Sequence, residues 1–262
     1  KYQGIYFMKK TLIALAVAAS AAVSGSAMAW TANGSGGSVD LSGTLTPAEK
    51  ITPWEVKTGD AVTDLNAQVQ KGQKEVSIYV KKAIPVLGIR TQNPVAFKGK
   101  PGISPQIDFG NAVNVDAFKN GRAPLTLEVK DAGNARIGTL TTSMGASALV
   151  SVKGPWSGYN HYYSESAGRA FFGGLSKNKA NAPDENIAVD VMPEVAAHYV
   201  DQGVSYRKVG AATDFTNARS TYSGYYASGI EQGKTIKITL DQPVDADEIV
   251  WKASLPVIVT YM

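Results

Sequence analysis

Cysteine is absent from this 262-residue sequence, and histidine occurs only twice. Without thiols the chain has no disulfide bonds, no thiolate metal ligands and no cysteine nucleophile. The two histidines, His161 and His198, lack the spacing of a helical metal-binding pair, and no third ligand type clusters beside them. Stability must come from apolar burial, strand pairing or partners, and we expect no metal and no cofactor.

An excess of charge of either sign is also missing. The 26 lysines and arginines oppose 22 acidic residues, and Lys1, Lys9 and Lys10 precede residue 30. The rest of the chain is close to neutral, so its charge indicates neither a nucleic-acid partner nor an anionic membrane surface.

The N-terminal region has the parts of a secretory signal peptide in order. Two lysines precede an apolar run at 12–19, and the small residues Ala27 and Ala29 form a cleavage site. A membrane anchor is the alternative, but the run is too short and too rich in alanine to span a bilayer. We predict a signal peptide over 8–29, preceded by untranslated residues 1–7, and no membrane span.

Apolar and polar residues alternate in most of the remaining chain. This period of two places apolar side chains on one face of a strand. Short alternating runs separated by Gly, Pro, Asn and Asp turns predict an all-β antiparallel sandwich. The runs lie at 76–80, 84–89, 125–129, 137–140, 236–240 and 255–261.

Helical patterns are few and short. Two apolar residues four apart predict two helical turns over 64–69. A second helix is expected to begin at Pro193 and end before Gly203, and a third turn falls within 164–172. The region from about 146 to 216 is therefore less strand-like, and we predict a small α/β subdomain inserted into the sandwich.

Both ends of the chain carry strand patterns. Segment 38–45 follows a glycine-rich lead whose composition is typical of flexible linkers. By itself it fits an ordinary first strand as well as a strand that reaches another molecule. One face of this segment carries Val39, Leu41, Gly43 and Leu45.

The last strand pattern is apolar on one face and contains Pro256, which donates no ladder hydrogen bond and so favours a sheet edge. A long apolar edge is an aggregation hazard unless a partner strand covers it. This predicts that another strand pairs with the edge. Its apolar face carries Leu255, Val257, Val259 and Tyr261.

Aromatic side chains gather in the polar, glycine-rich stretch 154–164. Aromatic rings stack on the C–H faces of sugars, while amide, imidazole and hydroxyl groups bond to sugar hydroxyls. The alternative is that these rings form the core of the insertion or contacts between subunits. The candidate glycan-binding residues are Trp156, Tyr159, Asn160, His161, Tyr162 and Tyr163. The second aromatic group, Tyr222, Tyr225 and Tyr226, is expected to be core or subunit surface.

Catalytic patterns are absent from the sequence. No serine stands in a G-x-S-x-G elbow. Residues 228–235 approximate a phosphate loop, but Ser228 replaces its first glycine and a strand follows, so we expect a turn. The acids within 241–248 lack the spacing of a calcium hand and are expected in a solvated turn. We therefore expect no enzyme activity.

Several stretches, in their order and placement, resemble FaeG-like major subunits of enterobacterial chaperone–usher fimbriae over nearly the whole chain. They are 8–16 (MKKTLIALA), 37–43 (GSVDLSG), 54–57 (WEVK), 85–91 (PVLGIRT), 105–109 (PQIDF), 168–175 (GRAFFGGL), 229–236 (GIEQGKTI) and 255–261 (LPVIVTY).

The resemblance implies an incomplete immunoglobulin-like sandwich completed by donor-strand complementation. In such families a periplasmic chaperone first fills the gap, an outer-membrane usher takes part in assembly, and the next identical subunit then supplies its N-terminal strand. It implies a donor extension at 30–46, with Gly43 at a narrow slot, and a pilin domain at 47–262. It also implies a fimbrium on the bacterial surface whose inserted subdomain binds host-cell glycoconjugates.

Two functions fit these observations. The first is a polymerising major subunit that is also the adhesin. The second is a purely structural pilin or capsule-like coat subunit with no glycan binding of its own. A secreted enzyme is a third class, for which the sequence offers no set of residues.

Overall fold

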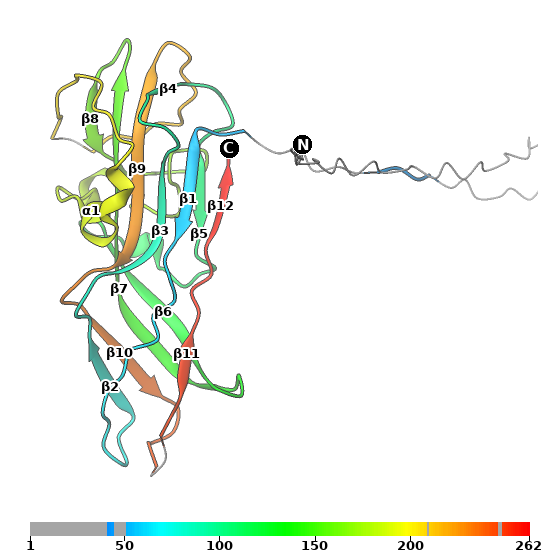
Figure 1. Ribbon diagram of the computed structural model, residues 1–262, viewed down its shortest axis with the longest axis vertical. Helices are drawn as coiled ribbons and strands as arrows, with labels where there is room; N and C mark the ends of the chain where they lie inside the picture. The colour runs from blue at the N-terminus through cyan, green and yellow to red at the C-terminus, as the bar shows by residue number, and fades with distance from the viewer. Residues whose placement is uncertain (1–40, 45–50, 209, 246–247) are drawn as a thin grey trace, which may run out of the picture. The chain divides into compact units, whose positions relative to one another are not determined.

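The computed structural model describes residues 41–44, 51–208, 210–245 and 248–262. Contacts divide the chain into two units, Lys1–Glu49 and Lys50–Met262, and the second contains every helix and strand of the described residues (Figure 1). In chain order these elements are β1 (Trp54–Thr58), β2 (Glu75–Tyr79), β3 (Ile84–Thr91), β4 (Phe97–Lys98), β5 (Pro105–Asp108), η1 (Val115–Ala117), β6 (Arg122–Asp131), β7 (Arg136–Lys153), β8 (Gly158–His161), η2 (Lys179–Asn181), α1 (Ile187–Val191), η3 (Pro193–Ala196), β9 (Thr221–Ile230), β10 (Thr235–Leu240), β11 (Trp251–Ala253) and β12 (Ile258–Tyr261).

The strands form antiparallel pairs. One sheet has the order β1-β3-β9-β7-β10-β2, with β4, β6, β8 and β11 attached beside this path, and a second sheet pairs β12 with β5. The fold is all-β and immunoglobulin-like, which confirms the predicted class. Strand β10 shows why the sequence folds this way, because Ile236, Ile238 and Leu240 are buried while the residues between them are exposed.

Strand β7 is 18 residues long and changes neighbours along its length. Its first half pairs with β6 and β10, and its second half pairs with β9 and β8. Residues 144–152 of β7 and 222–230 of β9 are buried without alternation, and α1 packs against these two strands. The predicted start of the insertion, at about 146, therefore lies inside β7. Between β8 and β9, the described residues of 162–220 contain no strand.

Aromatic rings fill the core between the insertion and the sheets. Their centroid distances run from 5.1 to 6.3 Å, and most pairs meet edge to face. Tyr222, Tyr225 and Tyr226 are all buried, which confirms that the second aromatic group belongs to the core. The rings of the cluster are Trp54, Phe97, Phe171, Phe215, Tyr222 and Tyr226.

The predicted helix over 64–69 is wrong, because this stretch contains neither helix nor strand. Its two apolar residues, Leu65 and Val69, both pack against the core. A spacing of four residues places side chains on one face of a helix and also on one face of an extended chain, so the pattern could not distinguish the two. The helix expected from Pro193 is the short 3-10 helix η3, and 164–172 contains turns and bends without a helix. Helix α1 was not predicted.

Candidate functional site

The last eleven residues before Met262 form one extended run with two paired ends. Strand β11 pairs with β6, and β12 pairs with β5 (Figure 1). Residues 254–257 between them belong to no strand, and Pro256 lies in this gap. Every second side chain from Trp251 to Tyr261 is partly buried against the core, and the others are exposed. The predicted acceptor residues Leu255, Val257, Val259 and Tyr261 all lie on the core face of this run.

A groove with a volume of about 1900 Å³ opens beside this run. One side is lined by residues between 58 and 70, and the other by residues of the 244–257 stretch, including Leu255 and Val257. Aliphatic side chains of β2, β6, β7 and β10 form its floor. They are Val76, Ile78, Leu125, Leu127, Leu140, Ile236, Ile238 and Leu240. Such a surface is suited to an apolar occupant rather than to a polar metabolite.

The predicted donor strand, 38–45, lies half outside the described residues. Val39 and Leu45 are not described, nor are the cleavage-site residues Ala27 and Ala29. Leu41 and Gly43 lie in the described stretch 41–44, which contains no helix or strand. The Leu41 side chain is 92% exposed, and a Cβ added at Gly43 would meet no atom within 4 Å.

The first aromatic group lies on the hairpin formed by β7 and β8. Strand alternation divides this group between two faces of β8. Tyr159 and His161 point to one face. Asn160 and Tyr162 point to the other face and are 0% and 1% exposed. Trp156 occupies the hairpin turn and is 51% exposed. Consecutive residues of a strand cannot all face a ligand, so Asn160 and Tyr162 face the interior, and Tyr162 belongs to the core, as the alternative for the aromatic rings states. Tyr163 is half-buried.

Two stretches that the sequence did not indicate, 205–208 and 210–211, lie beside β8 and Tyr162 through parallel bridges. The first stretch places the Tyr206 ring 5.2 Å from that of Tyr159 and 6.2 Å from that of His161. The Arg207 guanidinium lies 4.7 Å from the centre of the Trp156 ring, a cation–π contact. The Tyr-Arg-Lys triplet at 206–208 was the available clue, because a tyrosine beside two cations suits a binding surface.

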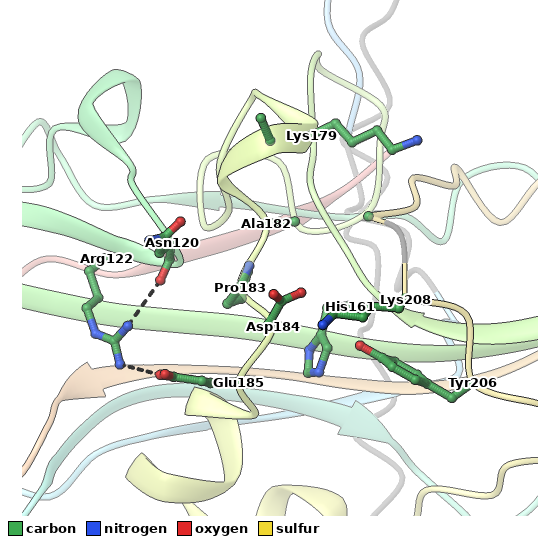
Figure 2. Close-up of a pocket in the computed structure, with 12 residues that line it drawn as sticks. Asn120, Arg122, His161, Lys179, Ala182, Pro183, Asp184, Glu185, Tyr206 and Lys208 are labelled. Atoms are coloured by element: carbon green, nitrogen blue, oxygen red, sulfur yellow. Dashed lines mark hydrogen bonds and ion pairs between the residues drawn. The ribbon is translucent and has the colours of Figure 1, made fainter.

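A polar pocket with a volume of about 330 Å³ opens next to these rings (Figure 2). The stretches 205–208 and 210–211, β8 and the residues before α1 contribute most of its wall. Its residues include Asn120, Arg122, His161, Asp184, Tyr206 and Lys208. Hydroxyl groups of a ligand would find both donors and acceptors on this wall.

His161 is the most enclosed titratable side chain of this pocket. It is 8% exposed, and its Nδ1 has no hydrogen-bond partner among the described residues. Burial lowers the pKa of His161, and the nearby Asp184 carboxylate opposes that effect. Burial therefore favours the neutral imidazole, and its Nδ1 is shielded from solvent.

Arg122 holds one end of the pocket in place. Its Nη2 lies 2.8 Å from Glu185 Oε2 and 2.7 Å from Glu231 Oε1, and its Nη1 donates to the Asn120 carbonyl at 3.2 Å (Figure 2). This guanidinium holds the pKa of Glu185 below its usual range. Because the Arg122 guanidinium already forms ion pairs with two carboxylates of the protein, it fixes the pocket wall and does not offer a free cation to a ligand.

The phosphate-loop-like segment and the second histidine are the remaining candidates for a chemical role. The segment 228–235 contains the end of β9, the turn 231–234 and the start of β10, so a turn precedes a strand there as expected. His198 is half-buried, with Nδ1 2.9 Å from the Thr91 carbonyl oxygen and 3.3 Å from Glu55 Oε1. Within the described ranges no group of three or more His, Cys, Asp or Glu could hold a metal ion, and no helix is long and apolar enough to cross a membrane.

Comparison with known proteins defines the class of the chain as a fimbrial subunit. It belongs to the K88-type family described as "Fimbrial, major and minor subunit", whose model matches residues 8–262. The K88 fimbrial protein AB of Escherichia coli is 31% identical over an alignment of 290 positions, which covers 97% of this chain and 100% of that protein. The F41 fimbrial protein of Escherichia coli is 30% identical over 284 positions, with the same two coverages. The family consists of structural subunits of surface fimbriae and not of enzymes.

Proposed function

We propose that this chain is a major fimbrial subunit that polymerises by donor-strand exchange and binds host glycans through its inserted subdomain. In this proposal residues 8–29 are a signal peptide, and a periplasmic chaperone and an outer-membrane usher bring the exported subunit to the cell surface. The N-terminal extension 30–46 of one copy then fills the apolar groove of the next copy.

The groove is the observation that carries the assembly proposal. Its floor is aliphatic, and one side is the run 251–261, whose core-facing side chains alternate with exposed ones. An added strand would supply the same alternation, with Val39, Leu41 and Leu45 directed at the floor. Full burial of each would contribute roughly 1.5–3 kcal/mol before ordering costs. Main-chain hydrogen bonds to an edge would add affinity that does not depend on side chains.

Deleting residues 30–46 tests the donor role. The shortened subunit keeps its groove, so we expect it to bind the chaperone but to form no fibres, because no neighbour receives a strand from it. Electron microscopy of the bacterial surface and co-purification with the chaperone are the measurements. Normal fibres from this variant would contradict the assignment of the donor strand.

The pocket beside β8 supports the glycan part of the proposal. Tyr206 is 41% exposed and backed by Tyr159, which gives a ring platform for the C–H face of a sugar. His161 and Asp184 line the adjoining wall, where the Asp184 carboxylate can accept hydrogen bonds from hydroxyls. Trp156, Tyr159, His161 and Tyr206 are thus the proposed contact residues. Asn160 and Tyr162 would act only by packing behind them.

Glycan-array binding of purified fimbriae tests this site. We expect Tyr206→Ala and Trp156→Ala each to weaken glycan binding by about tenfold or more, the equivalent of one lost ring contact of about 1.4 kcal/mol. Tyr79→Ala removes an exposed ring that does not line the pocket and should leave binding unchanged. If wild-type fimbriae bind no glycan, the purely structural pilin is the correct alternative. If binding survives both the Tyr206→Ala and the Trp156→Ala change, the site lies elsewhere.

A further inference from the structure

Residues 60–70, called the strap below, join β1 to β2 without forming a helix or a strand. All of them except Asp64 line the apolar groove. A backbone hydrogen bond fixes the chain at each end of the strap: Gly59 N donates to the Val86 carbonyl at 3.0 Å, and Gly72 N donates to the Val244 carbonyl at 2.8 Å. The strap is therefore held at both ends along one side of the proposed acceptor groove.

The strap contacts the groove mainly through two side chains. Leu65 and Val69 are its two partly buried residues and pack against the core, while the other nine positions are exposed. Among the described residues, the backbone hydrogen bonds that involve 60–70 are those from Asn66 N to the Asp64 carbonyl, at 2.8 Å, and from Gln73 N to the Gln70 carbonyl, at 3.1 Å. Strands β1 and β2 on either side are instead paired over five residues each.

This combination marks the strap as a weakly held part of the groove wall. A segment with few backbone bonds and few apolar contacts opens at a low free energy. Leu65 and Val69 cover aliphatic surface that would otherwise face water, and an incoming strand must bury that same surface. The two occupants compete for it.

We propose that the strap is an autoinhibitory cover: Leu65 and Val69 shield the groove floor of the free subunit and are displaced when the donor strand of a second copy enters. This inference rests on the proposed donor-strand function. Opening of the strap then limits the rate of assembly, and the shielded groove is less prone to unspecific apolar contacts before a donor arrives.

Thiol labelling tests the displacement, because the chain has no cysteine of its own. The full chain would carry Leu41→Asp, which weakens its own donor segment, together with either Leu65→Cys or Ala67→Cys. A peptide of residues 38–45 is the probe, and fluorescence anisotropy reports its binding. We expect the peptide to raise the labelling rate at position 65 by about tenfold and to leave the exposed position 67 unchanged. A rate at position 65 that stays constant or falls while the peptide binds would overturn the cover and leave donor-strand exchange standing.

Association kinetics give a second, independent readout. Leu65→Ser combined with Val69→Ser should raise the association rate of the peptide several-fold, while the matched pair Asn66→Ser and Gln68→Ser on the exposed face should not. Circular dichroism checks that each variant is folded. If the peptide binds only to the Leu65→Ser and Val69→Ser variant, the cover is supported, because removal of the two shielding side chains then permits entry. Absence of binding to every variant would contradict donor-strand exchange and the cover together.

Discussion

Replacing Val257 by lysine is expected to abolish fibre assembly while leaving the domain folded. Val257 lines the groove and lies on the core face of the last extended run. In the free subunit a lysine at this position reaches water through the open groove. Once a donor strand excludes water, its ammonium is buried without a partner, at a free-energy cost of several kcal/mol. Donor binding should therefore weaken by about a thousandfold or more.

The adjacent residue provides the control for this prediction. Ile258 is 56% exposed and points away from the core face, so Ile258→Lys adds the same charge to the same extended run but outside the groove. We expect Ile258→Lys to assemble and Val257→Lys to remain monomeric, as measured by sedimentation of refolded subunits. Equal assembly by the two variants would show that the groove does not receive the donor strand.

Phe171→Ala is expected to give the largest loss of stability in the insertion. The Phe171 ring is fully buried, stacks on Tyr226 at 5.5 Å and meets Trp54 edge to face at 5.7 Å. Truncating such a ring costs about 3–5 kcal/mol, a large part of the 5–15 kcal/mol that stabilises a typical domain. Urea unfolding should show this loss as a lower midpoint.

Phe172→Ala serves as the matched control for the core prediction. Its ring is half-buried and contacts the Lys177 ammonium at 5.9 Å rather than the ring cluster. We expect a much smaller loss of stability from this variant. A loss as large as that of Phe171→Ala would contradict the view that the cluster around Trp54 and Phe171 joins the insertion to the sheets.

Much of the fold was predictable from local alternation. The runs at 125–129 and 236–240 appear as β6 and β10 because one face of each is buried, and a period of two then repeats in the sequence. The same rule fails for β9 and the second half of β7, where both faces are buried and the alternation is lost. Helix α1 is also hard to detect, since its five residues give too short a period to identify.

The sequence indicated the apolar edge beside the groove, whereas it indicated only the aromatic strand beside the pocket. The apolar pattern of the last strand, with Pro256 inside it, indicated an edge that needs a partner, and Leu255 and Val257 do line the groove. At the pocket, the aromatic cluster indicated β8 but not which rings face outward, because strand direction and register are set by β7. Tyr206 and Asp184 were missed because tertiary contacts, not sequence neighbours, bring them to His161.

Complementation between two defective subunits tests the central claim most directly. The chain without residues 30–46 keeps a groove but has no donor strand, and the Val257→Lys chain keeps a donor strand but has a blocked groove. Each alone should remain monomeric. Mixed during refolding, the pair should give a one-to-one dimer and nothing longer, as measured by size-exclusion chromatography with light scattering. Absence of the dimer, or growth of the mixture into fibres, would contradict assembly by donation of the N-terminal strand into this groove.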